Sequence, residues 1–308
     1  MPRSVRALGC TRLTEPAVFL IPCANAQLPP LAVVVVAMTN DTAYEPRTVW
    51  LYYGLACAIT WVAALPAASA WIHHAQPEPG AVALAGLSAL GPLIAAFVLS
   101  VREGQLGAVF GRWRTPLVWP VLALLLPLAL RVLAAAFTAL VGGELSRWTY
   151  PPGAPEQVAA LFVLPVGEEL GWRGFAYPRL AQRYGLVRGS ILLGLMWGFW
   201  HLTYSITPTA HGFDWFVFLQ GMLECPLYAL IGSWLFEKGR RSMTVALVFH
   251  AAAHVDHIEL APHSELTLHA SHLGLVALAA LVAARQLRRL PAPPLALVSS
   301  EAPHGAIA

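Results

Sequence analysis

Long apolar segments follow one another along most of this chain and limit what it can fold into. About 20 consecutive apolar residues cross a membrane as a helix, which satisfies its own backbone hydrogen bonds in lipid. Of the 308 residues, 57% are apolar and 11% are charged, a balance too apolar for a soluble domain of this length. We therefore predict an all-α fold, a polytopic membrane helix bundle of about eight transmembrane helices. The predicted spans are 48–72, 80–101, 116–141, 157–178, 189–206, 214–236, 243–258 and 267–284.

The distribution of basic residues predicts how the bundle is oriented. Lys and Arg prefer the cytoplasmic connections of membrane proteins, and with a cytoplasmic N-terminus those connections carry clusters of them. The opposite connections hold one basic residue, Arg147. We expect a multi-pass protein of the cell membrane, surrounded by lipid, with both termini cytoplasmic. The small net charge of +3, with the basic residues in short clusters between apolar segments, argues against nucleic acid as a partner. The basic clusters are Arg102, Arg112 and Arg114; Arg179, Arg183 and Arg188; Lys238, Arg240 and Arg241; and Arg285, Arg288 and Arg289.

The ends of the chain differ in composition from the apolar middle. Residues 1–46 are broken by several prolines and predict a flexible leader, or one that is not translated if Met38 is the initiator. Residues 47–289 are expected to form one transmembrane domain. Residues 290–308, rich in Pro, Ala and Ser, predict a disordered tail.

Two carboxylates and a guanidinium lie inside the fourth predicted span. Charged groups persist in hydrocarbon only when they are paired, face a polar cavity or take part in chemistry. Glu169 and Arg173 are four residues apart, which predicts an ion pair on one helix face. Glu168 points about 100° away and could accept a proton from water as a general base. The alternative is that both glutamates pair with Arg173 and Arg131 and only hold helices together.

Two histidines, on two other predicted helices, lie at a depth similar to that of Glu168. His201, His250 and Glu168 are each about 14–20 Å from the cytoplasmic side, at a rise of 1.5 Å per residue. His250 and His254 are four residues apart and share a face, a spacing that helical metal sites use. A packed histidine pair, and a histidine that only bridges helices, remain open alternatives. Further polar residues inside the spans are Arg131, Glu224, His269 and His272.

These residues form an ordered set of three motifs. Glu168-Glu169 with Arg173, then Trp197 with His201, then His250 with His254 resemble the motifs of the CPBP intramembrane proteases, which include CAAX prenyl endopeptidases and bacterial Abi-type proteins. The family usually has Phe at position 197, and we expect the change to Trp to matter little. It usually has Asn or Asp at position 254, which leaves the role of His254 open.

The resemblance implies an intramembrane endopeptidase whose site faces the cytoplasm. Glu168 and His201 would activate a water molecule, and His250 and the residue at 254 would stabilise the oxyanion. Glu169 and Arg173 would support them. The substrate would be a peptide or protein, lipidated or not.

A metal and other functions remain open. Glu168, His201, His250 and His254 are candidate Zn²⁺ ligands by residue type, although we favour a water molecule held without metal. One alternative from another class is a non-catalytic membrane immunity or assembly factor that keeps the polar pocket. A proton- or ion-coupled transporter would also place Glu and His in a membrane, but the chain shows no internal repeat.

Overall fold

The computed structural model describes residues 46–143, 145–149, 163–207, 210, 212–254, 257–260 and 262–291. It separates Met1–Glu45 from Pro46–Ala308, and the description below concerns the second unit alone. The leader expected at 1–46 and the tail expected at 290–308 lie outside the described residues, apart from Pro46, Leu290 and Pro291.

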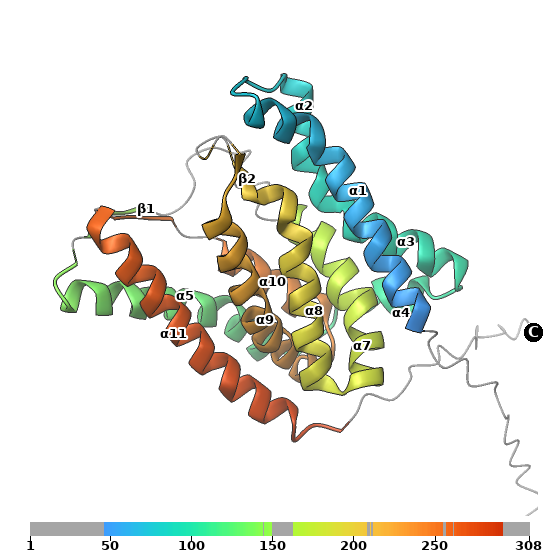
Figure 1. The fold of residues 1–308 in the computed structure, drawn as a ribbon. Helices are drawn as coiled ribbons and strands as arrows, with labels where there is room; N and C mark the ends of the chain where they lie inside the picture. The colour runs from blue at the N-terminus through green and yellow to red at the C-terminus, as the bar shows by residue number, and fades with distance from the viewer. Residues whose placement is uncertain are drawn as a thin grey trace, which may run out of the picture. The chain divides into compact units, whose positions relative to one another are not determined.

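The first half of this unit consists of helices joined by short connections (Figure 1). Residues 79–102 are helical throughout, with a single 3₁₀ turn in the middle. A proline begins α2 within its first turn, where its missing N–H costs no hydrogen bond. These elements are α1 (Pro46–Ile72), α2 (Pro79–Leu87), η1 (Ser88–Leu90), α3 (Gly91–Arg102), α4 (Leu106–Phe110) and α5 (Val118–Leu140).

The second half supplies the helices that carry the three motifs. Helical residues 163–169 continue into a π-helical segment and then into α7 without a break. α8 passes directly into a 3₁₀ turn. These elements are η2 (Leu170–Ala176, the π-helical segment), α7 (Tyr177–Tyr184), α8 (Leu186–Trp200), η3 (His201–Ser205), α9 (Trp215–Lys238), α10 (Met243–Ala253) and α11 (Pro262–Leu287).

Two short antiparallel strand pairs accompany the helices. β1 (Leu145–Thr149) pairs with β4 (His257–Leu260), and β2 (Ile206–Thr207) pairs with β3 (Gly212–Phe213). The sequence did not predict either pair. They leave the all-α class unchanged, because the described chain is otherwise built from helices.

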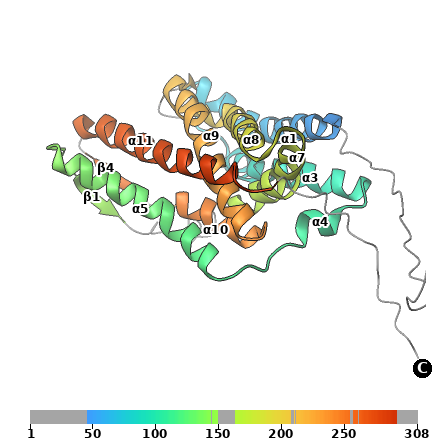
Figure 2. The same cartoon turned by 90° about the horizontal axis from the view of Figure 1, so that it is seen from below.

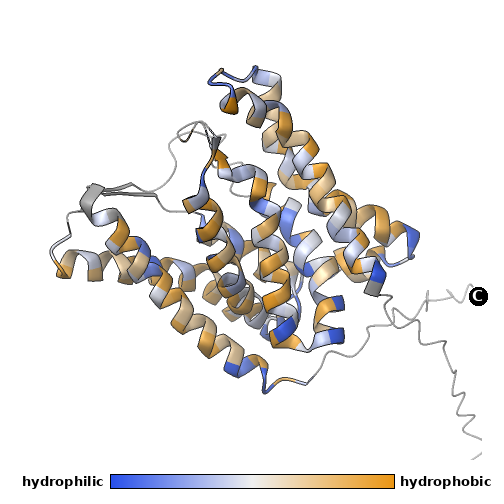
Figure 3. Ribbon diagram, viewed as in Figure 1, coloured by the Kyte–Doolittle hydropathy of each residue, from blue (hydrophilic) through white to orange (hydrophobic). Residues whose placement is uncertain are grey.

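The helices are those of a multi-pass membrane protein. Within the described residues, five are long and apolar enough to cross a membrane: 47–72, 79–102, 118–140, 215–238 and 266–287. Many large apolar side chains stay exposed, as expected where lipid is the surroundings, and hydrophobic residues recur along these helices (Figure 3). The count of eight spans stays a prediction. Helix was wrongly expected as far as residue 258, since α10 ends at Ala253.

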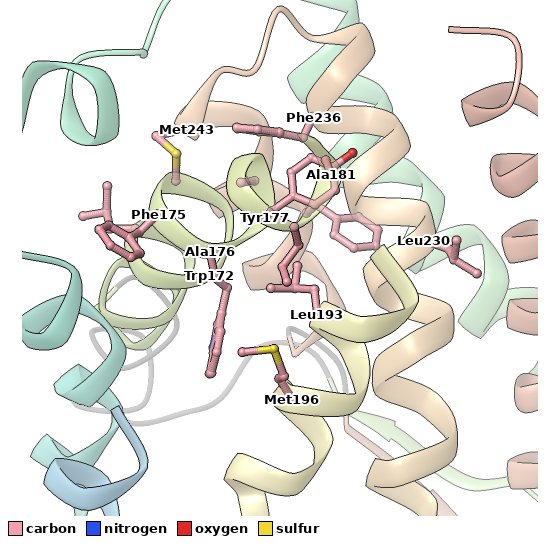
Figure 4. Packing of buried hydrophobic residues seen from close by; sticks show 14 of the residues in the cluster. Trp172, Phe175, Ala176, Tyr177, Ala181, Leu193, Met196, Leu230, Phe236 and Met243 are labelled. Atoms are coloured by element: carbon pink, nitrogen blue, oxygen red, sulfur yellow. The ribbon is translucent and has the colours of Figure 1, made fainter. Parts of the chain in front are cut away.

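The packed core surrounds η2 and α7. Trp172, Phe175 and Tyr177 are almost wholly buried, and the side chains of α8, α9 and α10 gather around them (Figure 4). α5 runs alongside both α10 and α11 (Figure 2). Close approach of α8 and α9 needs a glycine at position 194, where an added Cβ would lie 2.3 Å from the Cα of Pro226. The motif helices are therefore held by tight packing.

Candidate active site

The residues of the three motifs meet around the side chain of Trp197. The indole of Trp197 lies 2.7 Å from Glu168, and its ring centroid is 5.7 Å from that of His201 and 5.4 Å from that of His250. The rings of His250 and His254 are 5.1 Å apart. Three segments far apart in sequence thus bring their polar side chains to one place.

Glu169 is the centre of a buried ionic network. Arg173 donates from Nη1 to both oxygens of Glu169, so the ion pair predicted from the spacing is present. His250 Nδ1 lies 2.7 Å from the same carboxylate. Glu169, Arg173 and His250 are only 0%, 1% and 4% exposed. A carboxylate accepts hydrogen bonds, so Nδ1 of His250 carries the proton and Nε2 is the nitrogen left for other partners.

The guanidinium of Arg173 is enclosed more by packing than by hydrogen bonds. Its Nε and Nη2 atoms have no hydrogen-bond partner among the described residues. The group lies 5.9 Å from the centre of the Trp197 ring, a cation–π distance. It also lies against Gly232 of α9, where any Cβ would overlap it. A glycine at 232 therefore makes room for the cation.

Glu168 takes a different partner from Glu169. The indole Nε1 of Trp197 donates to Oε2 of Glu168 at 2.7 Å, and Glu168 is 6% exposed. A phenylalanine, which the family usually has at this position, offers no such donor. That Trp at 197 matters little stays a prediction, but the indole gives Glu168 a hydrogen bond that the sequence analysis did not foresee.

His201 is oriented by the end of α8. His201 Nδ1 lies 2.9 Å from the carbonyl oxygen of Trp197, which also accepts a backbone N–H at the end of α8. Because a carbonyl only accepts, Nδ1 carries the proton and Nε2 of the neutral ring keeps its lone pair. The 3₁₀ turn that begins at His201 follows this end, and the edge of the ring packs against Trp200, 4.9 Å away.

His254 lies just past the end of α10. It is the C-cap residue, with φ −113° and ψ 3°, and it is exposed. Its ring still faces that of His250 at an angle of 38°. The shared face predicted from the four-residue spacing is therefore kept, although the helix itself stops one residue earlier.

A cavity of about 440 Å³ adjoins this cluster. Glu169, Arg173, His201, His250 and His254 line it, as does Trp197. Among the described residues, the lining does not include Glu168. Glu168 is joined to the lining by its hydrogen bond with the indole of Trp197. The wall also contains four polar residues that the sequence analysis placed inside the spans, Arg131, Glu224, His269 and His272. Further polar or aromatic lining residues that had no predicted part in the site include Tyr204, Phe218, Gln220 and Tyr228.

Comparisons with known proteins bear on this part of the chain. Residues 151–255 match the family described as type II CAAX prenyl endopeptidase Rce1-like, and all seven motif residues lie within them. Over this region the chain is similar to the Rce1-like family. It is also 32% identical over 143 residues to a CAAX prenyl protease 2 of Methanococcus maripaludis. That match covers 42% of this chain and 52% of the relative, so the chain spans about half the length of the curated relative it matches.

The Rce1-like region does not offer an arrangement that suits a metal ion. Among the residues that the structure describes, no three or more His, Cys, Asp or Glu side chains are grouped to hold one. The hydrogen bonds do not by themselves prevent coordination, since Oε1 of Glu168 and Nε2 of His201 and of His250 remain available; what the described residues lack is a grouping of these atoms around one point. Zinc needs about four N, O or S donors in tetrahedral array. The four candidate ligands do not fit that requirement.

Proposed function

We propose that the protein is an intramembrane endopeptidase that hydrolyses a peptide bond with a water molecule activated by Glu168 and His201. The observation that carries the proposal is that one residue, Trp197, contacts Glu168, His201 and His250 beside a single cavity. The Rce1-like match and the protease name of the relative support the reaction class.

Glu168 and His201 hold the water molecule between them and help to remove its proton. Oε1 of Glu168 and Nε2 of His201 are the atoms that their own hydrogen bonds leave available. A water held between them loses a proton as its oxygen bonds to the peptide carbonyl carbon. The proton then passes to the nitrogen of the leaving amine as the C–N bond breaks. The products are a carboxylic acid and an amine.

His250 and His254 act on the oxygen of the tetrahedral intermediate. An oxyanion is stabilised by donors that are fixed before the reaction, and Glu169 fixes the His250 ring through Nδ1. Nε2–H of the doubly protonated ring donates to the oxyanion, while the charge of the ring is offset by Glu169. His254, beside it at the cavity wall, is the second donor in place of the usual Asn or Asp.

The substrate is proposed to be a peptide or protein that reaches the cavity from the cytoplasmic side of the cell membrane. The basic connections argue for that side. A prenylated C-terminal peptide is the first candidate, by analogy with the relative's name. Apolar lining such as Val217 and Phe218 would suit the side chains of a lipid-embedded peptide.

Replacing His201 with Ala is expected to lower kcat by about a hundredfold or more, because general base groups contribute about 10²–10⁴-fold. The assay uses detergent-purified protein, a farnesylated peptide ending in a CAAX sequence and the same peptide without lipid, with products identified by mass. His73→Ala is the matched control, since His73 also bonds through Nδ1 to a carbonyl four residues earlier, Ser69, but is exposed. Equal rates for wild type and His201→Ala would rule out the mechanism.

Removal of metal ions is expected to leave peptide hydrolysis within about twofold of the untreated rate, because no three or more candidate ligands among the described residues are grouped to hold a metal ion. Protein dialysed against a strong chelator is compared with untreated protein, and bound zinc is measured by mass spectrometry of the element. Loss of activity that added Zn²⁺ restores, with one zinc per chain, would replace this mechanism by a metal-assisted one.

A further inference from the structure

We propose that Trp197 is a positioning residue that holds both water-activating groups, Glu168 through its side chain and His201 through its backbone. The inference rests on the proposed function for what is positioned, but the contacts themselves are independent of it. Nothing in the motif resemblance assigns this role, since the usual Phe has no polar atom in its side chain.

The side-chain contact fixes one oxygen of Glu168 and leaves the other available. The indole Nε1–H donates to Oε2 at 2.7 Å, a short bond of the kind that a charged acceptor makes. No other hydrogen bond to the Glu168 side chain is present within the described residues. Without the Trp197 indole, no described hydrogen bond would fix the rotamer of Glu168. The indole N–H therefore determines where Oε1 of Glu168 points.

The backbone contact fixes the ring of His201. The carbonyl of Trp197 accepts from Nδ1 at 2.9 Å, which sets both the orientation and the protonated nitrogen of that imidazole. Glu168 and His201, the two groups proposed to activate the water, are therefore both oriented by Trp197. A shift of residue 197 would therefore disturb both contacts.

The indole is itself held by the cationic and imidazole groups around it. The Arg173 guanidinium lies 5.9 Å from the ring centre, and the ring of His250 lies 5.4 Å away. These neighbours belong to the network of Glu169. Besides the direct role proposed for His250, the network thus acts on the chemistry indirectly, because it keeps the indole N–H directed at Glu168.

A phenylalanine at position 197 separates the two roles. It keeps the backbone carbonyl for His201 and most of the ring packing, but it loses the N–H. Trp197→Phe is expected to lower kcat about tenfold, as for loss of one hydrogen bond to a charged group, with KM within about twofold. Trp61→Phe is the control, since its indole also donates a hydrogen bond, to the carbonyl of Trp200 at 2.9 Å, outside the cavity lining.

A second variant guards against a change of shape. Benzothienylalanine at position 197 keeps the bicyclic ring and replaces N–H by sulfur, so it should reproduce the loss in kcat. In a Glu168→Ala background, Trp197→Phe should cause no further loss of activity. Wild-type kcat in either variant, or a rise in kcat, would overturn the inference while leaving the proposed function in place.

A measurement that needs no substrate separates the inference from the proposed function. Trp197→Phe should lower the thermal midpoint in detergent by several degrees in the wild-type background and by clearly less in the Glu168→Ala background, because the bond is then already absent. Equal shifts in both backgrounds would show that no bond joins the two residues. If wild type cleaves no peptide but the two shifts of the thermal midpoint differ, the proposed function fails. The inference that Trp197 positions Glu168 then still stands.

Discussion

Glu168→Gln is expected to reduce kcat for peptide hydrolysis by about a thousandfold or more while the protein stays folded. The amide is nearly the same size as the carboxylate, and its oxygen can still accept from the Trp197 indole. It cannot take a proton from water, so the loss isolates the base, whose contribution is about 10²–10⁴-fold. Purified variant and wild type are compared on the farnesylated CAAX peptide over single turnovers, which separate chemistry from product release.

A matched carboxylate provides the control for this substitution. Glu237 forms an ion pair with Arg241 at 2.9 Å on α9, four residues away and outside the cavity lining. Glu237→Gln should keep wild-type kcat. If Glu168→Gln retained more than about a tenth of the wild-type rate, Glu168 would not be the base. If neither wild type nor variant hydrolysed peptides and cells carrying either behaved alike, the non-catalytic immunity or assembly factor would be the better account.

Arg173→Ala is expected to cause the largest loss of stability of any single change in the site, about 3–5 kcal/mol in the free energy of unfolding. The substitution leaves Glu169, which is 0% exposed, with His250 alone to balance its charge. It also leaves a space against Gly232 that packing cannot fill without movement. Unfolding by denaturant in a fixed detergent, followed by circular dichroism, measures the loss.

The control is a second i,i+4 pair outside the cavity. Arg241→Ala removes the ion pair with Glu237, whose side chains are 17% and 10% exposed, and should cost no more than about 1 kcal/mol. Arg173→Lys should fall between, since it keeps the charge and loses the two-pronged contact. Arg173→Ala and Arg241→Ala with equal effects would mean that the buried network contributes little to folding.

Relations along a single helix could be predicted from the sequence because helical geometry fixes them. The apolar segments gave helices close to their expected places, and the four-residue spacing gave the Glu169–Arg173 pair. The facing rings of His250 and His254 follow from the same rule. Even the gathering of the motifs was predicted, because the depth of each residue in a membrane follows from counting residues from a basic connection.

Relations between helices could not be predicted, because they depend on how the helices rotate and pack. His250 contacts Glu169 across 81 residues, and Trp197 contacts Glu168 across 29; no pattern in the sequence marks either pair. The change from an α-helix to a 3₁₀ turn at His201 could not be predicted either, because the turn itself, His201–Ser205, contains no proline or glycine. Tyr228 and Gln220 entered the cavity lining without any sequence signal, since on an apolar helix each could equally face a neighbour or lipid.

The π-helical segment η2 links the register of the site to that of the core. A π turn holds more residues than an α turn, and such turns occur often at functional sites. η2 contains Arg173 and continues directly into α7, which begins at the buried Tyr177. Deletion of one residue between Arg173 and Tyr177 would restore an α-helix and rotate α7 by about 100° relative to Glu169. Either the guanidinium or the tyrosine at 177 would then face the wrong side. The number of residues in this stretch is therefore fixed by two requirements at once, and a single deletion there cannot satisfy both.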